Sequence, residues 1–220
     1  MSNPAYSYSP LAREGWPFIA LFLLLTVLAA AFAPWWLALP FLLLFLFSVQ
    51  FFRDPARALP APLSGGILCP ADGRVIAIEA VEDPYLQRQA LKISIFMNVF
   101  DVHVNRLPIG GIVRQRWYLP GKFFNAALDK ASAENERNAL WVRTEEQQDV
   151  TVVQVAGLVA RRILCYVRPD EQVTTGQRFG FIRFGSRVDT YLPLTAVPLV
   201  HLGQRVRSGA EWIAQLEHSG

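Results

Sequence analysis

Residues 91–96 read Leu-Lys-Ile-Ser-Ile-Phe, a short run rich in isoleucine and free of glycine and proline. Such a run is typical of a β-strand. Three more stretches of this kind, bounded by Gly, Pro or Asp, lie at residues 74–79, 150–155 and 163–167. Together they predict a mainly β domain. The polar stretch 125–138 interrupts the pattern and has the composition of a helix or a loop.

A weak internal repeat indicates how these strands turn. Residues 173–178, Val-Thr-Thr-Gly-Gln-Arg, recur as 200–205, Val-His-Leu-Gly-Gln-Arg. A glycine turn after a valine strand, used twice, resembles the hammerhead turns of lipoyl- and biotinyl-type sandwiches. Residues 65–67, which lead into the Asp72-Gly73 turn, have the same form. We therefore expect one lipoyl/biotinyl-like β-sandwich domain over residues 65–220.

Two long apolar runs precede this domain. Residues 16–33 and 35–52 contain no charged side chain, and Pro34 separates them. Each run has 18 residues, so a helix of that length is about 27 Å long, close to the hydrocarbon thickness of a bilayer. We expect a membrane-anchoring helical hairpin within residues 1–52, followed by a proline-rich linker, residues 53–64.

Other interpretations of the apolar runs remain open. Small residues at 29–33 would suit cleavage of a signal peptide, although a second apolar run follows at once. The hairpin could also insert shallowly in the plane of the membrane. A buried core hairpin is disfavoured, because nothing downstream is large enough to cover it. Arg13, Arg53 and Arg57 flank the runs, which places both ends, and the rest of the protein, on the cytoplasmic face of the cell membrane.

The composition excludes several classes of protein. The chain of 220 residues has a net charge of +3 and no Lys/Arg run interleaved with aromatics, so nucleic acid is not an expected partner. A mildly basic domain suits anionic lipid head groups. Cys69 and Cys165 are too few for a disulfide framework or a metal site, so we expect a protein of a reducing compartment. We also expect both side chains to be buried in the protein.

Residues 184–188, Phe-Gly-Ser-Arg-Val, are the strongest candidate for chemistry. A serine hydroxyl in a strained turn can attack the preceding carbonyl, here that of Gly185, which has no side chain to block the approach. The resulting ester can eliminate to dehydroalanine, and hydrolysis then leaves a pyruvoyl group in place of Ser186. A Gly-Ser turn alone is weak evidence, because most such turns do no chemistry.

Four ordered stretches strengthen this hypothesis. They are residues 51–55 (Phe-Phe-Arg-Asp-Pro), 69–75 (Cys-Pro-Ala-Asp-Gly-Arg-Val), 96–106 (Phe-Met-Asn-Val-Phe-Asp-Val-His-Val-Asn-Arg) and 183–189 (Arg-Phe-Gly-Ser-Arg-Val-Asp). In this order and spacing the chain resembles the phosphatidylserine decarboxylase proenzymes in their short form. The resemblance implies self-cleavage at Gly185-Ser186 into chains 1–185 and 186–220, which stay together as a heterodimer.

The resemblance also implies the reaction. A pyruvoyl group condenses with a substrate amine and accepts the electrons released with CO₂, so the substrate needs an amine and a carboxylate on one carbon. Phosphatidylserine has both, and its product would be phosphatidylethanolamine in phospholipid biosynthesis. On a strand, Asp101, His103 and Asn105 would share one face. Imidazole titrates near neutral pH, and the resemblance implies that His103 serves decarboxylation, by protonating the product carbanion.

Asp72 is the third expected site residue. Aspartate is common in β-turns for structural reasons, but the longer forms of the family use the aspartate of this motif in an Asp-His-Ser relay for self-cleavage. Arg106 stands where that relay has its histidine, and an arginine cannot act as a base. The relay is therefore either rebuilt around His103 or works without a second histidine, and His201 fits a structural role more simply.

Several assignments stay open at the sequence level. Candidate cations for a lipid phosphate or carboxylate, equally interpretable as surface charges, are Lys122, Arg183 and Arg187. A membrane-tethered lipoyl-like adaptor would need neither Gly185-Ser186 nor His103. A pyruvoyl decarboxylase of a soluble amino acid would leave the two apolar runs without a purpose.

Overall fold

The computed structural model describes residues 9–122, 124, 126–127, 134–157, 163–183 and 185–217. The chain divides into two compact units, residues 1–56 and 57–220.

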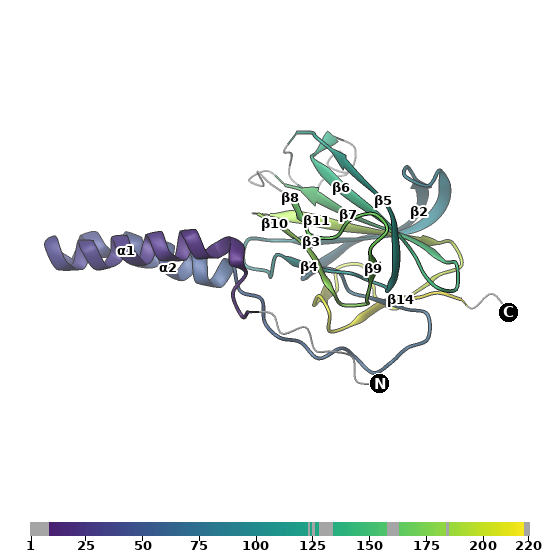
Figure 1. The fold of residues 1–220 in the computed structure, drawn as a ribbon, viewed down its shortest axis with the longest axis horizontal. Helices are drawn as coiled ribbons and strands as arrows, with labels where there is room; N and C mark the ends of the chain where they lie inside the picture. The colour runs from purple at the N-terminus through teal and green to yellow at the C-terminus, as the bar shows by residue number, and fades with distance from the viewer. Residues whose placement is uncertain are drawn as a thin grey trace. The chain divides into compact units, whose positions relative to one another are not determined.

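The first unit is the apolar helical hairpin that the sequence predicts. A 3-10 turn, η1 (Arg13–Gly15), leads into α1 (Trp16–Phe32), which runs beside α2 (Trp35–Phe51) (Figure 1). Ala33 is extended, as a residue before proline tends to be, and this ends α1. The backbone N–H of Ala12 donates to the carbonyl of Phe52 over 2.7 Å and joins the two ends of the hairpin.

The hairpin leaves its apolar side chains uncovered. No residue of α1 is buried in the described structure, and α2 buries only Ser48 and Phe51. Residues 13–32 form a helix long and apolar enough to cross a membrane, with a mean hydropathy of 2.2, whereas α2 is shorter, at 17 residues. A helix that is apolar on all sides needs an apolar surrounding.

The second unit is mainly β, as expected. Its strands in the described residues are β1 (Gly66–Leu68), β2 (Gly73–Asp83), β3 (Arg88–Met97), β4 (Val104–Arg106), β5 (Gly111–Leu119), β6 (Arg137–Arg143), β7 (Asp149–Ala156), β8 (Ile163–Cys165), β9 (Gln172–Val173), β10 (Arg178–Ile182), β11 (Ser186–Pro193), β12 (Val197–Pro198), β13 (Arg205–Val206) and β14 (Trp212–Gln215).

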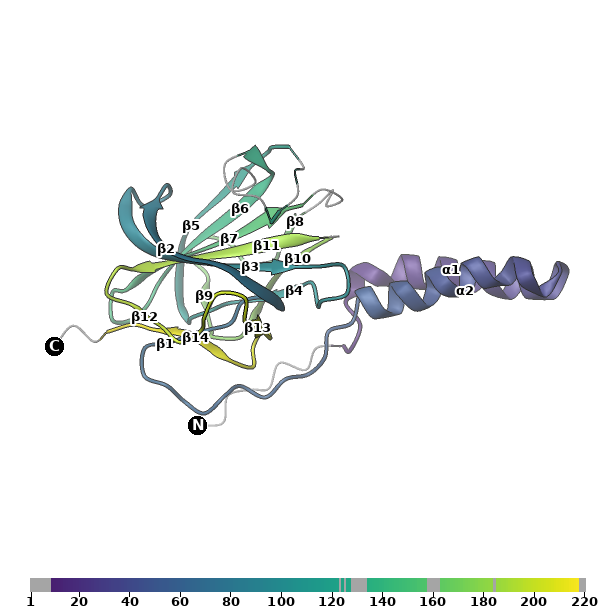
Figure 2. The same ribbon diagram turned by 180° about the vertical axis from the view of Figure 1, so that it is seen from behind.

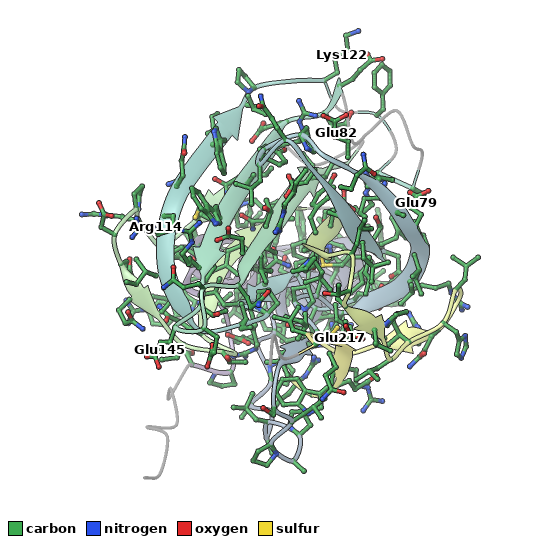
Figure 3. The ribbon with its side chains drawn as sticks, turned by 90° about the vertical axis from the view of Figure 1, so that its right-hand side faces the viewer. Glu79, Glu82, Arg114, Lys122, Glu145 and Glu217 are labelled. Carbon is green, nitrogen blue, oxygen red and sulfur yellow. The ribbon has the colours of Figure 1, made fainter. Side chains whose placement is uncertain are left out.

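These strands form one large sheet and two small ones, and the described pairs are antiparallel. The large sheet has the order β13-β2-β3-β11-β7-β6-β5-β9, and the small sheets have the orders β4-β10-β8 and β1-β14-β12. The large sheet curls into a half-barrel, with β1, β12 and β14 grouped below it in Figure 2. Viewed from its end, Glu79 of β2 lies on one side and Arg114 of β5 on the other (Figure 3). The sandwich expected from the sequence thus takes the form of a curled sheet closed by small ones.

The centre of the large sheet is buried on both faces. Every residue of β11 except Pro193 is buried, and in β7 only the first residue is not. One face packs in the main core with Ile95 and Val152, and the other contacts a smaller cluster around Val153 and Tyr191. A residue at the start of β11 is therefore held inside the protein.

The four predicted strands are present as β2, β3, β7 and β8, and the repeated turns have matching glycines, with φ of 81° at Gly176 and 84° at Gly203. The prediction of a helix or loop over residues 125–138 is wrong at its end, because Arg137 begins β6. Residues 125 and 128–133 lie outside the described residues. The sequence did not predict β5 and β6, because their polar and charged side chains lower the local β-propensity; pairing with each other and with β7 overrides it.

Candidate active site

Ser186 begins β11, where the chain passes from the small sheet of β10 to the large sheet. The residue is fully buried, and its Oγ has no hydrogen-bond partner among the described residues. Leaving a buried hydroxyl unpaired costs about 1–3 kcal/mol, so such a group calls for an explanation. The hydroxyls of Ser94 and Thr190 are also buried without a described partner. What sets Ser186 apart must therefore come from the residues next to it.

Gly185 is the first distinguishing neighbour. Its φ is +61°, and a Cβ built there would meet nothing within 4 Å. The left-handed conformation, rather than crowding, therefore favours glycine at this position. The peptide bond proposed for cleavage thus follows a residue in a conformation that other residues seldom adopt.

Gly157 is the second distinguishing neighbour of Ser186, and the sequence alone did not reveal it. Ser186 pairs with Ala156 of β7, so Gly157 lies opposite Gly185. A Cβ at Gly157 would lie 1.9 Å from the carbonyl oxygen of Gly185 and 2.8 Å from its carbonyl carbon. The carbonyl that Ser186 would attack thus rests on a backbone position where only glycine fits. No local pattern in the sequence reveals this contact.

His103 immediately precedes β4 and is fully buried. Its Nδ1 lies 2.9 Å from the carbonyl oxygen of Asp101. Because a carbonyl only accepts, Nδ1 carries the proton, and Nε2 is the basic nitrogen of the neutral ring. The carbonyl of His103 accepts from the N–H of Ile182 over 3.4 Å, which places His103 beside the segment that leads to Ser186.

The structure corrects the prediction that residues 101–105 form one strand with three side chains on one face. β4 begins only at Val104, and Asp101 lies in the preceding bend. The Asp101 carboxylate accepts from the N–H of Asn98 over 2.9 Å and pairs with Arg205, also over 2.9 Å. The Asp101 carboxylate therefore stabilises the loop that carries His103.

A buried chain of amides joins the small sheet to the large one. Met97 of β3 pairs with Ser186, and Asn105 Nδ2 lies 3.7 Å from the Met97 sulfur. Gln154 Nε2 donates to Asn105 Oδ1 over 2.8 Å, and Asn138 Nδ2 donates to Gln154 Oε1 over 3.0 Å. Because these groups satisfy one another away from water, they fix the sheet that carries His103 relative to the one that carries Ser186.

Asp72 lies at the same end of the large sheet but in a separate cluster. Arg57 binds its carboxylate with both Nη atoms, Nη2 at 2.7 Å from Oδ2, and the N–H of Ser208 donates to Oδ1 over 2.8 Å. Pairing across β2, β3 and β11 puts Asp72 about two strand spacings, roughly 10 Å, from Ser186. No described hydrogen bond joins Asp72 to Ser186 or His103. The described hydrogen bonds of the Asp72 carboxylate go to Arg57 and Ser208 instead.

The three candidate cations differ in their surroundings. Arg187 is 2% exposed and pairs with Asp189, with Nε at 2.8 Å from Oδ1. Its guanidinium is therefore already paired with a carboxylate inside the protein. Lys122 is exposed and pairs with Glu134 over 3.0 Å, and Arg183 is half-buried two residues before Gly185.

Arg106 and the cysteines supply no base or thiolate. The Arg106 guanidinium donates to the carbonyl of Gly176 over 3.4 Å, so this residue braces a turn. Burial raises the pKa of the Cys69 thiol well above its usual range, and burial also raises the pKa of Cys165. Cys69 is fully buried, as expected, whereas Cys165 is only partly covered. The described residues contain no cluster of three metal-binding side chains.

Comparisons with known proteins agree with the motifs. A family model described as phosphatidylserine decarboxylase matches residues 44–214. A phosphatidylserine decarboxylase proenzyme of Nitrosomonas europaea is 59% identical over 206 residues, which are 94% of this chain and 95% of that protein. Proteins of the same name from Ralstonia pickettii and Aromatoleum aromaticum are 56% and 57% identical, each over 98% of this chain and 100% of the relative.

Proposed function

Because the chain belongs to the phosphatidylserine decarboxylase family, we propose that it decarboxylates phosphatidylserine with a pyruvoyl group made from its own Ser186. The observation that carries this proposal is the buried, unpaired Ser186 hydroxyl directly after a left-handed Gly185. The residues fit the group, because cleavage at this bond would make residue 186 the start of a chain. When formed, the group condenses with the substrate amine and accepts the electron pair released with CO₂.

Self-cleavage needs only the chain and one water molecule. Ser186 Oγ bonds to the carbonyl carbon of Gly185 while the Gly185–Ser186 C–N bond breaks, and the hydroxyl proton ends on the freed amine. Loss of the Cα proton of residue 186 expels the Gly185 carboxylate from Cβ and leaves an enamine. A proton then adds to Cβ, which becomes the methyl group, and the nitrogen becomes an imine. Water hydrolyses the imine and releases ammonia. The products are chain 1–185 with a free carboxylate and chain 186–220 with a pyruvoyl N-terminus.

The strand order supports a heterodimer that holds together after cleavage. β11 pairs with β3 on one side and β7 on the other, and β13 and β14 pair with β2 and β1. All four partner strands belong to chain 1–185. Cutting before β11 would break one loop and leave these ladders intact. The catalytic domain of residues 65–220 would then remain one folded body.

In this proposal Gly157 positions the carbonyl that is attacked. We expect Gly157→Ala to slow self-cleavage at least tenfold, because even a modest displacement of reacting atoms is costly and the new Cβ would overlap the Gly185 oxygen. A time course on denaturing gels after synthesis measures the remaining precursor.

Gly110→Ala is the control for this substitution, because a Cβ there would approach the backbone of Val173 and Thr175 at 3.3 Å and would not meet the Gly185 carbonyl. Circular dichroism and a thermal unfolding scan separate slow cleavage from misfolding. A folded Gly157→Ala protein that cleaves at the wild-type rate would contradict the positioning role.

We assign His103 the return of a proton to the substrate carbon after CO₂ leaves. With Nδ1–H held by the Asp101 carbonyl, Nε2 is the position that takes up a proton and delivers it. The ring also lies 6.3 Å, between centroids, from the ring of Phe181 in β10, the strand before Ser186, so it is also our candidate base for self-cleavage in place of the histidine that Arg106 replaces. We retain Asp72 as an indirect contributor, because its pair with Arg57 anchors the turn that starts β2.

The substrate assignment is tested with the purified, cleaved protein. We expect it to convert phosphatidylserine in detergent micelles to phosphatidylethanolamine and CO₂, and to leave free serine and aspartate untouched. Hydroxylamine should inhibit, because it captures a reactive carbonyl, and added pyridoxal phosphate should have no effect. Turnover of a free amino acid with the lipid unchanged would move the protein to the soluble-substrate class.

We place the hairpin in the cell membrane with the second unit on the cytoplasmic side. The support is one helix that is long and apolar enough to cross and arginines at both ends of the hairpin. Cysteines introduced at the exposed Ser9 and Ala58 should react from the same side of the membrane. Labelling from opposite sides would indicate one span, and loss of residues 1–33 would indicate a signal peptide.

A further inference from the structure

Two loop tips of the second unit present large apolar side chains to solvent. Phe100, in the loop between β3 and β4, is 65% exposed, and Leu202, in the turn between β12 and β13, is 66% exposed. The loops are neighbours, because Arg205 at the start of β13 pairs with Asp101. Single exposed apolar side chains are ordinary on protein surfaces, but exposed apolar groups that gather in one place mark a binding surface.

Three exposed arginines lie on the segments that form or contact these two loops. Arg74, Arg205 and Arg207 are all exposed, and Arg74 Nη1 donates to the carbonyl of Gly203 over 2.7 Å, which holds it against the Leu202 turn. With Asp101 as the opposing charge, the set carries three positive charges and one negative. We call Phe100, Leu202 and these three arginines the Phe100–Leu202 patch.

The patch lies at the end of the large sheet that holds the proposed site. Met97, which pairs with Ser186, ends β3 three residues before Phe100, and His103 follows Phe100 by the same distance. Arg74 lies two residues after Asp72. Arg207 precedes Ser208, whose N–H binds the Asp72 carboxylate. A binding partner in contact with the patch would therefore face the elements that position the proposed catalytic residues.

We propose that the Phe100–Leu202 patch docks the second unit onto an anionic lipid bilayer, in addition to anchoring by the hairpin. The apolar tips would enter the boundary between head groups and acyl chains, and the arginines would bind lipid phosphates. The docking itself does not depend on the proposed function. Only its purpose, which is to bring lipid head groups to Ser186, rests on that function. Two loop tips offer far less surface than the roughly 800 Å² per partner of a stable protein interface, whereas membrane insertion of loop tips needs only a few side chains.

Depth-dependent quenching tests the docking directly. The full chain, with Cys165→Ala to remove the partly covered native thiol, carries Leu202→Cys labelled with an environment-sensitive fluorophore. It is reconstituted into vesicles of phosphatidylcholine and phosphatidylglycerol that contain spin-labelled acyl chains. We expect strong quenching and a blue-shifted emission, both weakened by added salt and in phosphatidylcholine alone.

Leu194→Cys in the same background is the matched control, because Leu194 is 52% exposed and follows the end of β11 opposite Ser186. Its label should remain unquenched. A label at residue 202 that is quenched no more than the one at 194 would overturn the proposal and leave a protein partner as the occupant of the patch. The measurement needs no turnover, so its failure is separate from failure of the decarboxylase assignment.

Kinetics supply a second test in the full chain. We expect Phe100→Ser with Leu202→Ser to raise KM about tenfold when phosphatidylserine is diluted at the surface of mixed micelles, because fewer protein molecules dock productively. Leu194→Ser with Val197→Ser removes two apolar groups outside the patch that are 52% and 48% exposed, and it should leave KM unchanged. A wild-type KM in the patch variant, with the wild-type protein active, would reject the docking while the function stands.

Discussion

Ser186→Ala should leave the protein as one uncleaved chain without decarboxylase activity. The substitution removes the only atom of residue 186 that can attack the Gly185 carbonyl, and with it the source of the pyruvoyl group. Since the wild-type hydroxyl is buried without a partner, its removal should not lower stability. Wild-type protein should instead show two fragments, 1–185 and 186–220, by denaturing gel and intact mass. The smaller fragment should resist Edman sequencing and be reducible by borohydride.

Ser94→Ala is the matched control, because Ser94 is also a buried serine with an unpartnered hydroxyl. It pairs with Asp189 on β11, three residues beyond the proposed cleavage site. This variant should cleave and decarboxylate normally. A wild-type chain that stays intact with a free serine at 186, or a Ser186→Ala chain that still cleaves there, would reject the pyruvoyl mechanism.

His103→Ala should lower the decarboxylation rate by about 10²- to 10⁴-fold, the range typical of lost general acid–base catalysis. The rate is measured per cleaved molecule, so that incomplete self-cleavage does not count as lost chemistry. His103→Asn separates positioning from proton transfer, because its amide can still donate to the Asp101 carbonyl but has no basic nitrogen. We expect the Asn variant to fold well and to remain as slow as the Ala variant.

The same proteins show whether His103 also serves self-cleavage. Precursor that accumulates in both variants would make His103 the base that replaces the relay histidine, whereas complete cleavage would limit it to the substrate reaction. His201→Ala should behave as wild type in both assays, since His201 is exposed and, among the described residues, its Nδ1 lies near the neighbouring carbonyl of Leu202. Full decarboxylase activity in His103→Ala would remove this residue from the site.

Local sequence properties determined a large part of the protein. Two uncharged runs of helical length predicted the hairpin of α1 and α2, because the length and charge of a single segment suffice for that inference. The strands β2, β3, β7 and β8 followed from composition, and the turns at Gly176 and Gly203 from a repeated glycine. The Gly185-Ser186 motif and its companions led to the family, because the order and spacing of motifs are properties of the chain itself.

Tertiary structure alone decided how the site is arranged. Gly157 lies against the Gly185 carbonyl because β7 and β11 pair in one register, and register between distant strands is not written in either strand alone. The Asp72 carboxylate is held by Arg57 and Ser208, residues 15 and 136 positions away. Arg187 resembles a surface cation in the sequence, yet β11 is buried on both faces. In each case the deciding contact joins segments that are remote in sequence, so only the folded chain brings them together.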